Sequence, residues 1–164
     1  MNKQDYKVSV LSSKLGVPLN FVVHTHLVTE HDGVINRYDV FAPFTLSKNH
    51  SPYLGVIFKN LLPPATGFLL WYQKKKWWQA DAPLRRWETK VYSTVAGDEE
   101  SCARTLWEFI EKGGLEQYPH QTQYRFVRGP NSNTFTQWVV DQFPECDLSL
   151  PWNAWGKGYK IKSR

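Results

Sequence analysis

The most informative segment of the chain is Gly129-Pro130-Asn131-Ser132-Asn133-Thr134-Phe135. It sets a serine hydroxyl between two asparagines, and the apolar residues that follow recur at helical spacing as far as a proline at position 144. The segment therefore predicts the start of a helix, where unpaired N–H groups and partial positive charge favour a nucleophile or stabilise an oxyanion. The same box also predicts a plain helix cap formed by Ser132 or Asn131.

Two strands are expected upstream of this box. Residues 21–28 are rich in β-branched and apolar side chains, which predicts a strand with His24 and His26 on one face. Residues 30–33 supply turn chemistry, and residues 34–41 form a second strand pattern that contains Asp39. An antiparallel hairpin would make His24 a neighbour of the polar side chains on the second strand.

The middle of the chain is less regular. Residues 42–83 contain five prolines, so we expect an irregular insertion rich in proline, aromatic residues and lysine. Within it, residues 61–78 mix aromatic side chains with three consecutive lysines, a composition that suits either a packed hairpin with a charged face or contact with a membrane surface. The role of this segment is left open.

Four further segments complete the expected order. Residues 87–95 predict a strand, and residues 97–113 predict a helix that acidic residues open and two glycines close. Residues 124–127 predict a short strand that leads into the serine box, and residues 151–164 are expected to pack through Trp152 and Trp155. The sequence thus predicts an α+β fold, an antiparallel sheet packed with a few helices.

Length and composition favour one compact domain. The chain has 164 residues, 41% hydrophobic and 21% charged, and no repeat or change of composition marks a boundary, so residues 1–164 form one domain with a core at about 20–159. The two cysteines show neither disulfide-scaffold nor zinc-site spacing and favour a reducing compartment. Neither a signal-peptide pattern nor an apolar run of membrane-spanning length is present, so we expect a cytoplasmic protein, with export by another route left open.

Several classes of function lack support in the sequence. The net charge of +5 is moderate and partly local, in lysine and arginine clusters that are typical of solvated faces, so nucleic acid is not an expected partner. No nucleotide-binding glycine loop, metal cluster or kinase signature occurs, and we expect no cofactor. Oligomeric state has no sequence signal.

These residues carry a resemblance to bacterial domain-of-unknown-function family 3750. It rests most specifically on the box at 129–135, and more weakly on residues 24–28, 37–40, 124–126 and the closing segment that contains Lys157. The resemblance extends over most of residues 21–159. The usual family pattern has Trp after His-Thr, so His26 departs from it.

The box also resembles the Asn-Cys-Asn-His-Phe segment of permuted papain-like enzymes, such as PPPDE peptidases and lecithin:retinol-acyltransferase-like proteins. That resemblance implies a nucleophile at Ser132, in place of cysteine, a base at His24 and an orienting group at Asp39. It also implies that Asn131 and Asn133 support the site or its oxyanion hole, and that His26 and Lys157 line the cleft. A serine hydroxyl, unlike a thiol, does not ionise at a helix N-terminus, so Ser132 would need His24 as a general base.

Three classes of function remain. The first is a hydrolase or acyltransferase acting on an amide, ester or thioester of a peptide, protein tail or lipid. The second is a catalytically inactive papain-like module that binds such a ligand, and the third is a protein that binds a membrane surface or a partner through residues 61–78. Each candidate residue also has a purely structural alternative: the histidines form hydrogen bonds to backbone or water, Asp39 pairs with Arg37, and Lys157 is a surface lysine.

Overall fold

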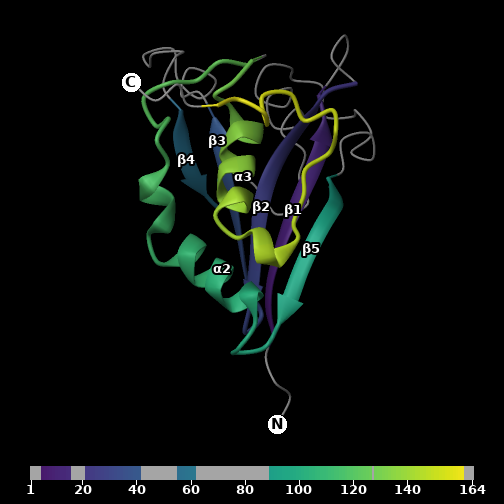
Figure 1. The fold of residues 1–164 in the computed structure, drawn as a ribbon, viewed down its shortest axis with the longest axis vertical. Helices are drawn as coiled ribbons and strands as arrows, with labels where there is room; N and C mark the ends of the chain where they lie inside the picture. The colour runs from purple at the N-terminus through teal and green to yellow at the C-terminus, as the bar shows by residue number, and fades with distance from the viewer. Residues whose placement is uncertain (1–4, 16–20, 42–54, 62–88, 127, 161–164) are drawn as a thin grey trace, which may run out of the picture.

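The computed structural model describes residues 5–15, 21–41, 55–61, 89–126 and 128–160. Its centre is a five-stranded antiparallel sheet in the order β4-β3-β2-β1-β5 (Figure 1). The strands are β1 (Tyr6–Lys14), β2 (Val23–His31), β3 (Val34–Phe41), β4 (Val56–Lys59) and β5 (Lys90–Gly97). The predicted α+β class with an antiparallel sheet is confirmed.

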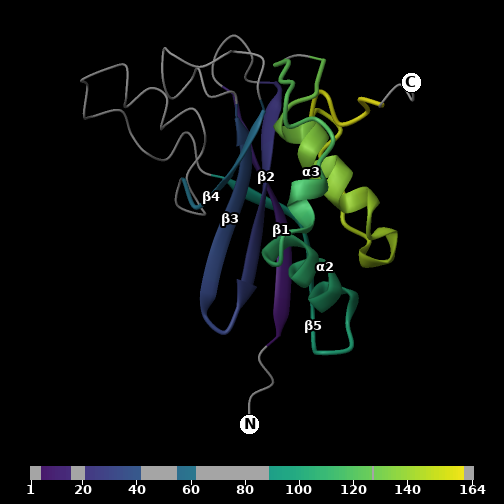
Figure 2. The same cartoon turned by 90° about the vertical axis from the view of Figure 1, so that its left-hand side faces the viewer.

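Two helices cover one face of this sheet, as the edge-on view shows (Figure 2). They are α2 (Cys102–Glu111) and α3 (Ser132–Asp141), and each is followed by a 3-10 turn, η3 (Gly114–Gln117) or η4 (Pro144–Cys146). Ser101 caps α2 by accepting from the N–H of Arg104, in the helix predicted for residues 97–113. Asn131 caps α3, which follows the serine box as predicted.

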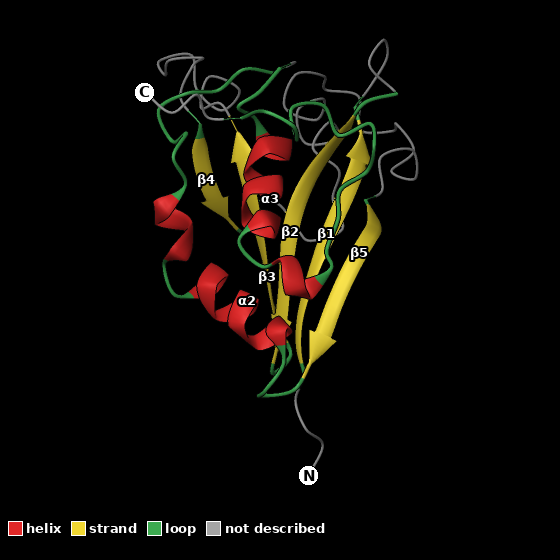
Figure 3. Ribbon diagram, viewed as in Figure 1, coloured by secondary structure: helices red, strands yellow, loops and turns green. Residues whose placement is uncertain are grey.

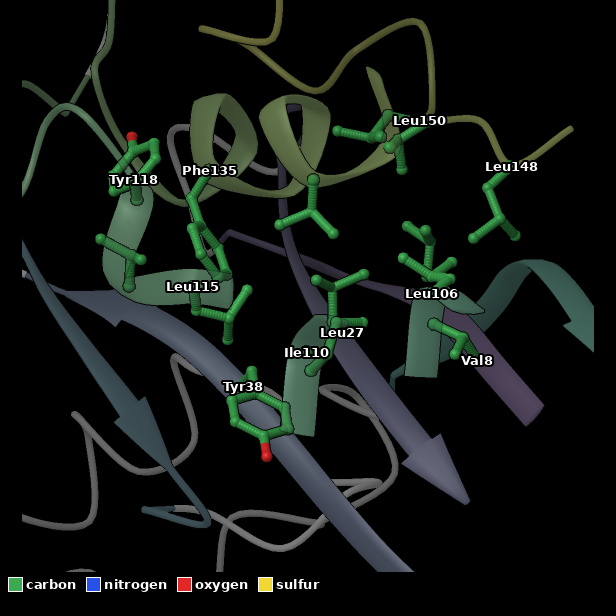
Figure 4. Packing of buried hydrophobic residues seen from close by; sticks show 14 of the residues in the cluster. Val8, Leu27, Tyr38, Leu106, Ile110, Leu115, Tyr118, Phe135, Leu148 and Leu150 are labelled. Carbon is green, nitrogen blue, oxygen red and sulfur yellow. The ribbon is translucent and has the colours of Figure 1, made fainter. Parts of the chain in front are cut away.

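The core lies between the helices and the sheet. Alternate residues of β1 and β2 and residues spaced three or four apart on the helices meet there, as their periodicities require. Figure 4 shows Phe135 reaching from α3 toward Leu115, with Ile110 of α2 beside Leu27 of β2. Phe135 and Leu27 are fully buried, so truncating either would create a cavity and cost about 2–5 kcal/mol.

The hairpin of β2 and β3 was predicted closely. Asp32 and Gly33 form its two-residue turn with φ of 53° and 74°, the two positive values that a type I′ turn needs. Glu111 at the end of α2 ties this hairpin down by accepting from Asn36 at 3.0 Å and from Lys59 of β4 at 2.8 Å. The far end of the hairpin is thereby held against the helical layer.

Three features of the fold differ from the expectation. Residues 124–126 form no strand, because their backbone is used to close a loop, in which Arg125 N–H donates to Pro130 at 2.7 Å and Gly129 N–H donates back to Arg125 at 3.1 Å. Trp152 does not pack, since its side chain is 85% exposed. Strand β1 was not predicted, although it lies inside the sheet between β2 and β5.

The irregular insertion is described only at residues 55–61, where β4 is one short piece. The remainder of residues 42–83, including most of the aromatic and lysine-rich segment at 61–78, lies outside the described residues. In the described part of the chain, no helix combines the length and the apolar character needed to cross a membrane.

Candidate active site

The candidate site lies where β2 and β3 stop pairing. The two strands pair from His31 and Val34 to Leu27 and Tyr38, and beyond that pair they diverge (Figure 3). Had the register continued, Asp39 would lie opposite His26. The polar side chains of His24 and Asp39 lie in the space beyond the last pair.

Three predicted residues meet in this space. The Oγ of Ser132 lies 2.8 Å from Nδ1 of His24, and Nε2 of the same ring lies 2.9 Å from Oδ1 of Asp39. All three side chains are buried, and the His24 ring stacks on Phe41 at a centroid distance of 5.3 Å. The hydroxyl, the imidazole and the carboxylate therefore form one continuous chain of hydrogen bonds.

The charge of Asp39 sets the direction of that chain. Burial favours the protonated acid, but the hydrogen bond from His24 and the positive charge of Arg37 hold the pKa of Asp39 well below its usual range. Arg37 donates from Nε to Oδ2 at 2.5 Å and from Nη2 to Oδ1 at 3.2 Å. An ionised carboxylate can only accept, so Nε2 of His24 carries the proton and Nδ1 accepts from Ser132.

Asn131 fixes the start of α3. Its Oδ1 accepts from the N–H groups of Asn133 at 3.0 Å and Thr134 at 3.2 Å, and its own N–H donates to Thr134 Oγ1, which completes a capping box. Its Nδ2 donates to the carbonyls of Phe126 and Trp155. The cap is therefore Asn131, which leaves the Ser132 hydroxyl for His24.

Asn133 joins α3 to the strand that carries His24. Its Oδ1 accepts from the N–H and the hydroxyl of Thr25, both at 2.9 Å, and its Nδ2 donates to the Val23 carbonyl at 2.9 Å. The side-chain amide thus takes the role of a missing β3 peptide group in the diverged part of the sheet. This bridge holds Ser132 against His24.

Both asparagine side-chain amides therefore hold the backbone around the site in place. Both Nδ2 groups donate to backbone carbonyls, and the N–H groups of Asn133 and Thr134 donate to the Asn131 side chain. Among the described residues, the backbone N–H of Ser132 has no acceptor. It is the donor at the helix start that stays free for a developing oxyanion.

A small cavity adjoins the hydroxyl. It measures about 20 Å³, room for about one water molecule, and its lining combines the site residues with apolar and aromatic side chains. The lining residues are Leu15, Val22, Val23, His24, Tyr124, Phe126, Asn131, Ser132, Asn133 and Trp155.

Tyr124 is a lining residue that the sequence did not single out. Burial raises the pKa of its phenol and the charge of Asp39 raises it further, so the hydroxyl stays protonated. The only available signal was its position in the segment leading to the serine box.

The other two predicted cleft residues, His26 and Lys157, contact groups outside the cavity lining. His26 is fully buried on the same face of β2 as His24, with a centroid distance of 6.1 Å between their rings. Lys157 donates from Nζ to the carbonyls of Leu150 at 3.3 Å and Pro151 at 3.0 Å. Neither is among the described residues that line the cavity.

One group in the described part of the chain has the composition of a metal site. Ligand atoms of His24, His26 and Asp39 lie within 4.8 Å of one another. Both ring nitrogens of His24 and both oxygens of Asp39 already have hydrogen-bond partners, so a cation there would have to break at least one of these bonds. The arrangement therefore favours proton transfer over metal binding.

Comparison with known proteins places the chain in a family. The family model described as Protein of unknown function (DUF3750) matches residues 66–159, more than half of the chain. The chain belongs to the DUF3750 family. The DUF3750 match contains the serine box and Tyr124, whereas His24 and Asp39 precede it. No curated protein and no solved structure matched the chain.

Proposed function

We propose that the chain is a hydrolase or acyltransferase acting on an amide, ester or thioester, with Ser132 as nucleophile and His24 as general base. The observation that carries this proposal is the 2.8 Å contact between Ser132 Oγ and the proton-free Nδ1 of His24. That distance lies within the range for direct proton transfer. Asp39 acts as the positioning residue, since it holds the proton on the opposite nitrogen.

In the first step, Ser132 Oγ attacks the substrate carbonyl carbon while its proton passes to His24 Nδ1. The oxyanion that forms accepts from the backbone N–H of Ser132. Collapse of this tetrahedral intermediate breaks the bond to the leaving group, which takes the proton from Nδ1 of His24. An acyl-serine remains. Water or an acceptor alcohol or amine then attacks the acyl group, giving its proton to Nδ1, and His24 returns that proton to Ser132.

The order of the groups supports a permuted papain-like relationship. A histidine on an early strand and a nucleophile at the start of a later helix are the features that such enzymes share, and here His24 and Ser132 hold those positions. The use of the two ring nitrogens is the reverse of that in the chymotrypsin triad, where Nε2 faces the serine. Both arrangements give the hydroxyl a base and give the base an acceptor for its other N–H.

Substrate access sets a requirement on this mechanism. Ser132 and His24 are only 3% and 4% exposed, and the adjoining cavity has room for a water molecule but not for an acyl group. Rim side chains such as Phe126 and Trp155 must therefore move aside when substrate binds. A peptide, a protein tail or a lipid could supply the acyl group.

The same burial favours a second proposal, a papain-like module that binds a ligand at the rim and performs no chemistry. The two proposals differ in whether Ser132 forms a covalent bond. In the binding module the hydrogen-bonded chain would serve only to hold α3 against β2.

A fluorophosphonate probe tests the first proposal directly. Incubation should add one probe molecule at Ser132, located by peptide mapping, and the protein should hydrolyse p-nitrophenyl butyrate. Ser132→Ala should abolish labelling, and His24→Ala should slow hydrolysis by about 10³-fold or more. Ser101→Ala, which alters the cap of the other helix, is the matched control and should keep both activities. Absence of labelling and hydrolysis in folded protein would favour the binding module.

A further inference from the structure

Four aromatic side chains are exposed around the cavity. Phe126 and Trp155 line it, and the Phe21 ring contacts Trp155 edge-on at a centroid distance of 5.3 Å. Trp152 lies in the turn just before that of Trp155, and Asn153 between them donates to the Phe21 carbonyl at 2.7 Å. The exposed fraction ranges from 38% for Trp155 to 85% for Trp152. A large aromatic surface at the opening of the cavity, which we call the mouth, therefore faces water.

The segments that build the mouth carry charge of one sign. In the described residues 14–15, 21–24, 124–126, 128–131 and 151–160 there is no aspartate or glutamate. The same segments hold five cationic side chains: Lys14, Arg125, Arg128, Lys157 and Lys160. All but Lys157, whose amine is bonded to two carbonyls, are exposed. The described segments at the cavity therefore combine exposed positive charge with exposed aromatic side chains.

The position of these segments suits a flat partner. They lie together at one end of the molecule, opposite the N-terminus and above the helices in Figure 1. The four exposed aromatic residues belong to turns and loops, outside the helices and strands of the described chain. Tryptophan in this setting, with cations around it, is typical of a surface that inserts at the boundary between lipid headgroups and acyl chains.

We propose that this aromatic and basic surface, defined by Phe21, Phe126, Trp152, Trp155 and the cations Lys14, Arg125, Arg128 and Lys160, docks on an anionic lipid bilayer. Anionic headgroups attract each of these cations, and the indole rings add apolar burial. Docking goes beyond the proposed function and does not require Ser132 to react. It would bring the cavity rim to a surface rich in acyl esters.

Vesicle co-sedimentation tests this proposal. Vesicles of phosphatidylcholine alone are compared with vesicles of phosphatidylcholine and phosphatidylglycerol, at low and high salt. We expect at least about tenfold tighter binding to the anionic vesicles, lost as salt rises because the charges are exposed. Equal binding to both vesicle types, or to neither, would overturn the proposal.

Substitutions test which residues bind the vesicles. Trp152→Ser, at a nearly fully exposed side chain, and the double variant Arg125→Gln/Arg128→Gln should each weaken binding at least about fivefold. Tyr92→Ser on β5 and Lys112→Gln after α2 remove an exposed aromatic ring and an exposed cation elsewhere, and should leave binding unchanged.

Two further results would overturn the proposal. One is binding that survives the mouth variants but is lost when Lys74, Lys75 and Lys76 are changed to glutamine. The other is capture by a poly-glutamate peptide without any binding to anionic vesicles, which would make the surface a protein interface. Ser132→Ala should bind vesicles like the wild type, so docking and catalysis can fail separately.

Discussion

His24 of β2 donates to Asp39 of β3 over 2.9 Å, across the part of the sheet where the two strands no longer pair. Asp39 also lies near His26, since ligand atoms of His24, His26 and Asp39 are within 4.8 Å of one another. Strand β3 thus orients the His24 ring in two ways, because Asp39 accepts from it and Phe41 stacks on it.

Asp39→Asn should reduce both activity and stability. An asparagine can donate to Nε2 of His24 and so favours the tautomer that turns an N–H toward Ser132, which should lower the rate of ester hydrolysis by about 10⁴-fold. The buried Arg37 guanidinium would also lose its counter-ion, at a cost of about 3–5 kcal/mol in the free energy of unfolding. Hydrolysis kinetics and urea denaturation measure the two effects separately.

A double-mutant cycle separates the ion pair from the catalytic role of Asp39. Arg37→Met and Asp39→Asn each remove one member of the buried ion pair, so the double variant should lose much less stability than the sum of the two singles. Its hydrolysis should remain as slow as that of Asp39→Asn. Strict additivity in stability would contradict the buried pair.

Acid should destabilise the protein partly through Asp39. Because the pKa of Asp39 is lowered in the folded state, its contribution is fully present above the unfolded pKa of about 3.9 and is lost as the pH falls toward the folded pKa. The loss is about 1.4 kcal/mol per pH unit in that range. Other carboxylates titrate there too, so the quantity to measure is the difference in unfolding free energy between wild type and Asp39→Asn from pH 6 to pH 2.5. A constant difference would contradict the lowered pKa.

Ser132→Cys should create a reactive thiol. A cysteine at the first position of α3, with His24 beside it, should form a thiolate and react with iodoacetamide near pH 6, well below the ordinary cysteine pKa of about 8.5. Peptide mapping distinguishes the new site from Cys102 and from the buried Cys146, whose pKa burial raises. His24→Ala in the same background should return the reaction to ordinary alkaline pH, and reactivity that ignores His24 would contradict the pair.

Local patterns in the sequence predicted most of the elements near the site. Residues 34–41 have the period of a strand and an Asp-Gly turn before them, and the observed β3 has those bounds. The serine box predicted the start of α3 because asparagine before a helical pattern is a strong cap. The sequence left open whether His24 and Ser132, 108 positions apart, are in contact, and only the resemblance to permuted papain-like enzymes suggested them as a pair.

The rest depended on contacts between distant segments. The strand predicted at residues 124–127 does not form at residues 124–126, because the backbone of Arg125 is hydrogen-bonded within the loop, to Pro130 and Gly129. The bonds of Asn133 to Val23 and Thr25 are tertiary contacts with no periodic signal. The sequence therefore left open whether the asparagine amides support the site or form its oxyanion hole. The exposure of Trp152 runs against the usual behaviour of tryptophan, and only packing could reveal it.

Chelation should have no effect on activity. Both oxygens of Asp39 and both ring nitrogens of His24 already have hydrogen-bond partners, so the His24, His26 and Asp39 group is poorly prepared for a cation. Dialysis against EDTA should leave the hydrolysis rate and the melting temperature unchanged. Stoichiometric zinc or iron in the purified protein, with loss of activity on its removal, would make this a metal site instead.

Asn133→Ala should separate α3 from β2. The change removes the acceptor of the Thr25 N–H and the donor to the carbonyls of Val23 and Trp155, all near the buried end of the helix. Losing partners for several buried groups should cost about 3 kcal/mol or more, against about 1 kcal/mol for the cap variant Ser101→Ala on the other helix. In the Ser132→Cys background, the same change should slow alkylation near pH 6, because the thiol would no longer be held against His24. Equal stability losses in the two variants, with alkylation unchanged, would show that the Asn133 bridge does not position the nucleophile.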